Sequence, residues 1–156
     1  MTMVATPRDI LVSKGIGNYV ICCVDTADDI LPGTIVTTIG NTADTNNVCW
    51  PDGANDTVLG IAGCTAGHDI LTGYATGDTI PVYPVGLFTE AWVLMAANCG
   101  AIKRGDFIES TVDGTGLGTI ATGENIDVGY EKVGRAAMEC PDNANNHFCK
   151  VRLTGH

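Results

Sequence analysis

The sequence predicts an all-β fold, a single-domain β-barrel or β-sandwich with turns rich in Gly, Asp and Asn. Twenty Gly and six Pro divide the 156 residues into short apolar runs. These runs recur at close to the spacing of about 8–12 residues that is typical of sandwiches and barrels, and runs that favour a helix are almost absent. A chain of this length is the size of one domain. We therefore expect one folded domain over residues 18–156, preceded by an extended N-terminal arm over residues 1–17.

Nine apolar segments, rich in β-branched and aromatic residues, are the expected strands. In chain order they are Tyr19–Val24, Thr34–Ile39, Val58–Cys64, Thr79–Val85, Phe88–Leu94, Phe107–Thr111, Leu117–Ala121, Lys132–Glu139 and Phe148–Leu153. Between them lie stretches whose Asn, Asp and Gly supply the backbone angles of turns: Asn41–Asn47, Pro51–Asp56, Asp113–Gly118 and Pro141–Asn146. A turn or two of helix is expected in the Ala, Leu and Met-rich stretch Trp92–Cys99, which Gly100 would end.

A weak internal repeat links the two halves of the chain. Leu31-Pro-Gly-Thr-Ile-Val is followed, after a polar loop, by Thr57-Val-Leu-Gly-Ile-Ala-Gly. In the second half, Ile102-Lys-Arg-Gly-Asp-Phe-Ile is followed, after another loop, by Lys132-Val-Gly-Arg-Ala-Ala. Each unit predicts a Gly-containing turn, a strand, a loop and a Val-Gly strand. Two such units can close on each other as a barrel or sandwich, which hides their unpaired edges.

The order of these short motifs resembles that of the small capsid decoration proteins, also called cement or head-stabilising proteins, of tailed bacteriophages and related archaeal viruses. The motifs are Gly33-Thr-Ile-Val, Val58-Leu-Gly-Ile-Ala, Gly77-Asp-Thr-Ile-Pro-Val, Pro84-Val-Gly-Leu-Phe, Ile102-Lys-Arg-Gly-Asp-Phe-Ile, Val133-Gly-Arg-Ala and Val151-Arg-Leu. The resemblance implies a structural virion protein that binds the major capsid protein on the capsid exterior and stabilises the shell. It also implies self-association, commonly as a homotrimer. The alternative is a β-sandwich module that binds a carbohydrate or belongs to the virus tail, with Tyr74, Tyr83 or Tyr130 stacking on the ligand.

Charge and hydropathy exclude two classes of partner. Eighteen acidic and eight basic residues give a formal net charge of −10, which repels nucleic-acid phosphates and anionic membrane surfaces. No apolar run approaches the roughly 18 residues that cross a bilayer. The N-terminus also lacks the basic segment followed by an apolar one that marks a secretion signal. We expect neither nucleic acid nor a membrane as a partner, and synthesis in the host cytoplasm.

Residues suited to catalysis are sparse, so we expect that the protein is not an enzyme. Ser13 and Ser110 are the two serines, and neither lies in a Gly-x-Ser-x-Gly elbow. Cys64 and His68 could form a nucleophile and base pair. Two such residues four apart also arise readily by chance, and a surface loop is the favoured interpretation.

Seven cysteines without a secretion signal predict reduced and mostly buried thiols. Cys140, His147 and Cys149 are the best candidates for a metal site, because thiolate and imidazole both suit Zn²⁺, but a fourth ligand is missing. A Cys140–Cys149 disulfide that closes the loop is the alternative. We expect no metal and no other cofactor.

The expected contacts with the capsid or with a neighbouring subunit lie in the arm and in the most apolar run, Leu87–Ala97. An extended arm can add to a neighbouring protein as a strand, and this arm holds two of only eight basic residues. A frayed terminus is the alternative for the arm. The candidate contact residues are Val4, Pro7, Arg8, Ile10, Leu11, Lys14, Phe88 and Trp92.

Overall fold

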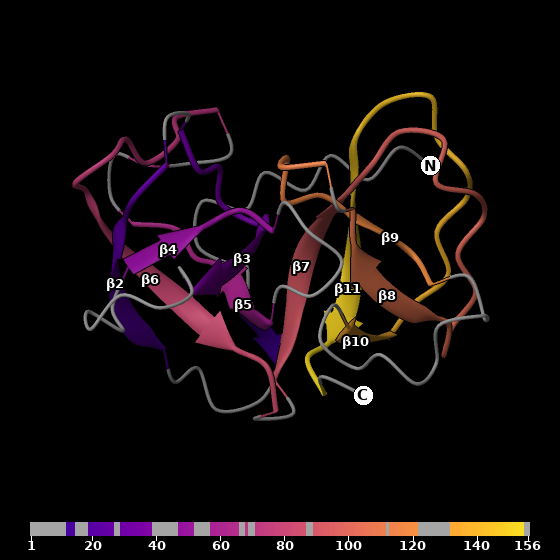
Figure 1. Ribbon diagram of the computed structural model, residues 1–156. Helices are drawn as coiled ribbons and strands as arrows, with labels where there is room; N and C mark the ends of the chain where they lie inside the picture. The colour runs from indigo at the N-terminus through magenta and orange to yellow at the C-terminus, as the bar shows by residue number, and fades with distance from the viewer. Residues whose placement is uncertain are drawn as a thin grey trace.

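The computed structural model shows an all-β protein in which two small barrels lie side by side (Figure 1). It describes residues 12–14, 19–26, 29–38, 47–51, 57–65, 68, 71–86, 89–111, 113–121 and 132–154, and none of these residues is helical. The all-β prediction is therefore confirmed, and of its two architectures the chain adopts the barrel.

The first barrel is closed and has the strand order β2-β4-β3-β5-β6. Its strands are β2 (Val20–Val24), β3 (Ile35–Thr38), β4 (Asn47–Cys49), β5 (Val58–Ala62) and β6 (Thr79–Pro84). Alternate residues of β2 point inward, as the two-residue period of a strand requires: Cys22 and Val24 are buried in a core that Ile30, Val36, Val48 and Tyr74 help to fill.

The second barrel is built on the same principle from the C-terminal half of the chain. Its strands are β7 (Glu90–Met95), β8 (Phe107–Ser110), β9 (Gly118–Ile120), β10 (Lys132–Ala136) and β11 (His147–Arg152), in the sheet order β7-β11-β10-β8-β9. An additional parallel pairing, Met95 with Gly118, joins β7 to β9 and closes the ring of strands. The short strand β1 (Val12–Lys14) pairs with the first two residues of β7.

Each of the nine predicted strands corresponds to an observed one, and two three-residue strands were missed. β1 lies inside the predicted arm, and β4 begins at Asn47, where a turn was expected. Each contains a single β-branched residue, Val12 or Val48, so neither shows the run of β-branched residues that marks a strand.

The predicted helix over Trp92–Cys99 is wrong. Residues 92–95 belong to β7, which pairs with β11 along its whole length, and the chain then turns at Asn98, whose φ is 54°. Ala91, Val93 and Met95 are fully buried, while Trp92 and Leu94 on the other face are half-buried. Burial of this alternating face on a barrel core outweighs the modest helix propensity of Ala, Leu and Met.

Candidate interaction site

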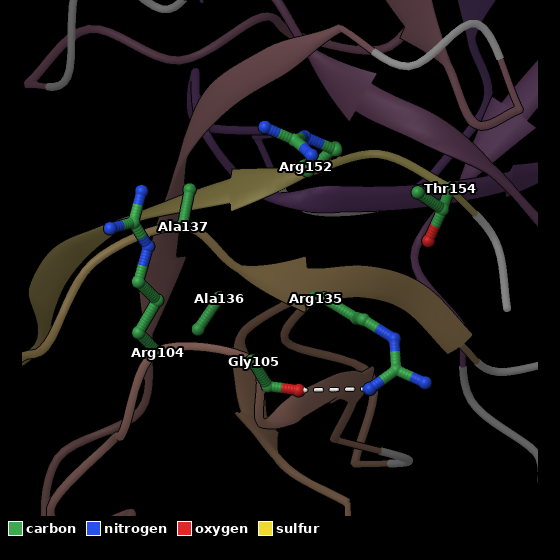
Figure 2. A pocket seen from close by; sticks show the side chains of 7 residues that line it. All are labelled: Arg104, Gly105, Arg135, Ala136, Ala137, Arg152 and Thr154. Atoms are coloured by element: carbon green, nitrogen blue, oxygen red, sulfur yellow. Dashed lines mark hydrogen bonds between the residues drawn. The ribbon is translucent and has the colours of Figure 1, made fainter.

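A shallow hollow with three arginines on its rim lies on the second barrel. It has a volume of about 330 Å³ and is lined by Arg104, Gly105, Arg135, Ala136, Ala137, Arg152 and Thr154. The turn before β8 and the ends of β10 and β11 supply these residues. Figure 2 shows the three guanidinium groups set apart around the hollow and pointing in different directions. The arrangement therefore forms a broad basic surface and does not grip one small anion.

The charges of the hollow are partly balanced within the protein. The Arg152 guanidinium donates to the carboxylate of Glu90, with 2.7 Å between Nη2 and Oε1. Arg135 donates from Nη1 to the carbonyl of Gly105 at 3.1 Å, and its guanidinium lies 3.7 Å from the centre of the Phe107 ring. Such stacking on an aromatic face holds a guanidinium flat and is worth about 0.5–1 kcal/mol at an exposed site. Arg104 and Arg135 are exposed and available to a partner.

The basic residues are distributed very unevenly between the barrels. Residues 15–89, which contain the first barrel, include eight Asp and no Lys or Arg. Residues 90–156, which contain the second barrel, include six of the eight Lys and Arg. The sequence reasoning did not single out Arg104, Arg135 and Arg152, although a comparison of charge between the two halves would have drawn attention to them.

An exposed apolar surface lies on the opposite barrel, at the start of β2. Exposed fractions are 55% for Tyr19, 43% for Val20 and 54% for Ile21. Tyr19 meets the ring of Tyr83 on β6 edge to face, with 6.0 Å between ring centres. Three consecutive exposed apolar residues at the start of one strand are typical of an interaction site.

Two of the predicted contact positions, Lys14 and Trp92, can be compared with the structure. Lys14 belongs to β1, where its backbone pairs with Glu90. Trp92 is half-buried on β7, and the Nζ of Lys150 lies 5.1 Å from its ring centre. Phe88 lies outside the described residues. The other predicted contacts, Val4, Pro7, Arg8, Ile10 and Leu11, also lie outside the described residues.

The tyrosines proposed for ligand stacking do not form an exposed strip. Tyr74 is fully buried, and its hydroxyl donates to the carbonyl of Gly63 at 2.9 Å. Burial raises the pKa of this phenol. Tyr83 is half-buried against Tyr19, and Tyr130 lies outside the described residues.

The two cysteine and histidine groups have structural contacts. His68 donates from Nδ1 to the carbonyl of Gly73 at 3.0 Å and stacks on Tyr74, with 4.2 Å between ring centres. Cys140 and Cys149 are both buried free thiols, and the hydrogen bond between them, together with burial, raises the pKa of Cys149. His147 bonds through Nδ1 to the carbonyl of Asn145. Within the described part of the chain, no three His, Cys, Asp or Glu side chains are grouped so that they could hold a metal ion.

The described residues include no helix that is both long and apolar enough to cross a membrane.

Comparison with solved structures finds a protein with a similar fold. It is similar to a bacteriophage head-fibre base. The crystal structure of the head fiber gp8.5 N base in bacteriophage phi29 superposes with a TM-score of 0.51, covering 88% of this chain and 94% of that one. The two sequences are 11% identical, so the likeness is one of fold. No family model and no curated protein matches the sequence.

Proposed function

We propose that this chain is a structural virion protein, not an enzyme, that binds the outer surface of a viral capsid and stabilises it as a homotrimer. The observation that carries the proposal is the similarity of both barrels together to the head-fibre base, which extends over 88% of this chain. A match of that extent covers the arrangement of two barrels and not one barrel alone. The order of motifs in the sequence independently resembles capsid decoration proteins.

The surfaces of the protein fit this role. The exposed apolar start of β2 and the basic hollow lie on different barrels, so one chain can contact two partners at once. In an oligomer on a capsid, weak contacts from each subunit combine because the first contact raises the effective concentration of the others. The major capsid protein is the proposed partner, and residues 1–11 the proposed contact, because they carry Pro7 and Arg8 next to strand β1.

Co-sedimentation with capsids that lack this protein tests the proposal. The purified chain should pellet with the capsids at a fixed and saturable ratio, and electron microscopy should show added density on the outer surface. Decorated capsids should also release their DNA at a higher temperature than bare ones. A chain that stays in the supernatant at micromolar concentration would contradict the proposed function.

A deletion of residues 1–11 tests the contact separately. We expect capsid binding to weaken at least tenfold, while a variant in which residues 1–11 are replaced by Gly and Ser of equal length controls for chain length. Binding that is unchanged in both variants would refute the arm as the contact and leave capsid binding itself standing.

A further inference from the structure

The two barrels have the same strand order and the same strand directions. β2 to β6 correspond one by one to β7 to β11: β2 pairs in parallel with β4, as β7 does with β9. The remaining pairings around each barrel are antiparallel and join equivalent strands. The chain is therefore an internal duplication at the level of topology.

The correspondence extends to single residues. In the first barrel β3 pairs with β5 through Ile35↔Ile61, Val36↔Gly60 and Thr37↔Val58, and in the second β8 pairs with β10 through Phe107↔Arg135, Ile108↔Gly134 and Glu109↔Lys132. The irregularity in register falls at the same step in both. Gly33 and Gly105 both take a positive φ, and each donates its N–H over 2.8 Å to the equivalent alanine carbonyl.

The first barrel uses one surface to pack against the second. We call this the docking surface: Gly33, Ile35, Val58 and Ile61, all buried. Ile35, Val58 and Ile61 join the same apolar cluster as the interior of the second barrel.

The second barrel meets the docking surface with the outer face of β7 and β11, which we call the receiving surface: Trp92, Leu94 and Phe148. The N–H of Leu94 donates to the carbonyl of Gly33 at 2.8 Å. A Cβ on Gly33 would lie 2.6 Å from the Phe148 ring, so the two surfaces are in close contact.

Each barrel also carries a second surface that lies away from the joint between the barrels. The second barrel has an equivalent of the docking surface, and the first barrel has an equivalent of the receiving surface. In the second barrel, the residues equivalent to the docking surface are Gly105, Phe107, Lys132 and Arg135, which lie beside the arginine-rimmed hollow. In the first barrel, the residues equivalent to the receiving surface are Ile21, Cys23 and Thr79. Ile21 is 54% exposed, and Thr79, Gly105 and Arg135 are exposed as well.

The barrels are arranged head to tail. In Figure 1, β2 and β6 lie on the left, β3 and β5 face β7, and β8 lies on the right, away from the first barrel. The outer receiving surface and the outer docking surface therefore lie at opposite ends of the molecule. Heterologous surfaces of this kind join copies into a closed ring or an open filament, depending on the rotation between copies.

We propose that the protein associates with a second copy of itself through these ends, the docking surface of its second barrel binding the receiving surface of the next copy's first barrel. The contact repeats the geometry of the joint within the chain, so that the carbonyl of Gly105 accepts from the N–H of Cys23 of the neighbour, as that of Gly33 accepts from Leu94. Three copies closed in this way form a ring of six equivalent barrels. This self-association does not depend on capsid binding and can be measured on the protein alone.

Charge and surface chemistry support this partner. The docking end exposes Arg104 and Arg135, whereas the half of the chain that holds the receiving end has eight Asp and no Lys or Arg. Residues 90–156 also include nine Asp and Glu, so these exposed arginines, and not the net charge of that half, favour contact with the acidic first barrel of the next copy. The Arg135 guanidinium stacked on Phe107 presents a flat cationic surface to Tyr19 and Ile21, which are exposed side chains that such a group can cover.

Two single substitutions at opposite ends test the interface. Light scattering coupled to size exclusion should give an oligomer for the unaltered protein at micromolar concentration. Ile21→Glu and Arg135→Glu should each weaken association at least tenfold. Leu71→Glu is the matched control, because Leu71 is 86% exposed and lies outside both surfaces, and it should leave the mass unchanged. Thermal unfolding verifies that each variant is folded. A monomeric unaltered protein, or an oligomer that survives both end substitutions, would overturn the proposal.

A cysteine crosslink tests the register of the contact. Arg104 precedes Gly105 and is exposed, so Arg104→Cys should crosslink to Cys23 of the neighbouring copy with a short bis-maleimide and give a ladder that ends at the ring size. The double variant Arg104→Cys, Cys23→Ser should lose that ladder. A ladder of equal intensity in the double variant, or crosslinked dimers alone, would show that the copies do not meet head to tail.

Discussion

Gly134 offers the sharpest test of the packing, because β10 and β11 approach each other too closely there for any side chain. A Cβ at this position would lie closer than 3.0 Å to three backbone atoms, the O and C of Arg152 and the N of Thr154. In a Gly134→Ala variant the facing backbone must retreat by about 1 Å, which takes a hydrogen bond beyond its range of about 2.7–3.2 Å. Overpacking costs about 1–3 kcal/mol and each lost backbone bond about 1 kcal/mol. We expect a loss of about 3–4 kcal/mol.

Gly86→Ala is the control for backbone strain alone. Gly86 has φ +91°, and no atom lies within 4 Å of the place that a Cβ would take, so alanine there should cost about 1–2 kcal/mol. Urea unfolding of the three proteins gives the two losses, and in a thermal scan the difference should appear as a drop of about 2–4 °C for each kcal/mol. Gly60 faces the carbonyl of Tyr83 in the equivalent way, so Gly60→Ala should match Gly134→Ala. Equal losses for Gly134→Ala and Gly86→Ala would refute the reasoning.

Three further outcomes follow from single side chains. Tyr74→Phe removes a buried hydroxyl and leaves a carbonyl without its donor, so urea unfolding should show a loss of about 1–3 kcal/mol. Hydrogen bonds from Thr115 and Thr111 lower the pKa of Asp113. The ionised carboxylate therefore stabilises the fold at neutral pH, and this contribution is lost as pH falls below about 4. The difference in free energy of unfolding between Asp113→Ala and the unaltered protein should shrink over that range. The hydrogen bond with Cys140 and burial raise the pKa of Cys149. Mass spectrometry after alkylation of the dilute, folded monomer, in which no neighbouring copy covers Cys23, at a pH of about 8, near the ordinary thiol pKa, should therefore find Cys149 unmodified and the half-buried Cys23 modified. Equal labelling would contradict the burial of Cys149.

The strands could be predicted because their pattern is local. Val58–Ala62 and Lys132–Ala136 each hold a Val one or two residues before a Gly, and the structure confirms both as strands. The repeated turn, strand and Val-Gly strand units also appeared in the sequence, and they are the elements that the structure places in equivalent registers.

The remaining features depend on contacts between distant residues. The closure of two separate barrels rests on single pairings such as Met95 with Gly118, and no local pattern encodes them. β7 was partly mistaken for a helix because Ala, Leu and Met favour a helix in isolation, whereas its pairing with β11, a strand far along the chain, decides the outcome. The arginine-rimmed hollow was missed for the same reason, since Arg104, Arg135 and Arg152 come together only when β8, β10 and β11 pair.

The differences between equivalent residues of the two barrels predict how strong each joint is. Within the chain, apolar residues meet apolar residues: Ile35 and Ile61 are fully buried. At the outer ends, Phe107 and Arg135 stand at the positions equivalent to Ile35 and Ile61. In the proposed contact between copies, Thr79 of the next copy faces them at the position equivalent to Phe148. The joint within the chain should therefore depend mainly on apolar burial, whereas association between copies should depend more on charge.

Salt distinguishes these two kinds of joint. The screening length falls from about 30 Å at 0.01 M salt to about 3 Å at 1 M, so the attraction between the exposed Arg104 and Arg135 of one copy and the acidic first barrel of the next weakens strongly while apolar burial does not. We expect the dissociation constant of the oligomer to rise at least tenfold between low and high salt, while the midpoint of thermal unfolding of the dilute monomer changes little. Sedimentation equilibrium at several salt concentrations measures the first quantity and calorimetry the second. Association that strengthens with salt would show that repulsion between copies of net charge −10 outweighs the attraction of these arginines, and the acidic first barrel would then have no part in recruiting the next copy.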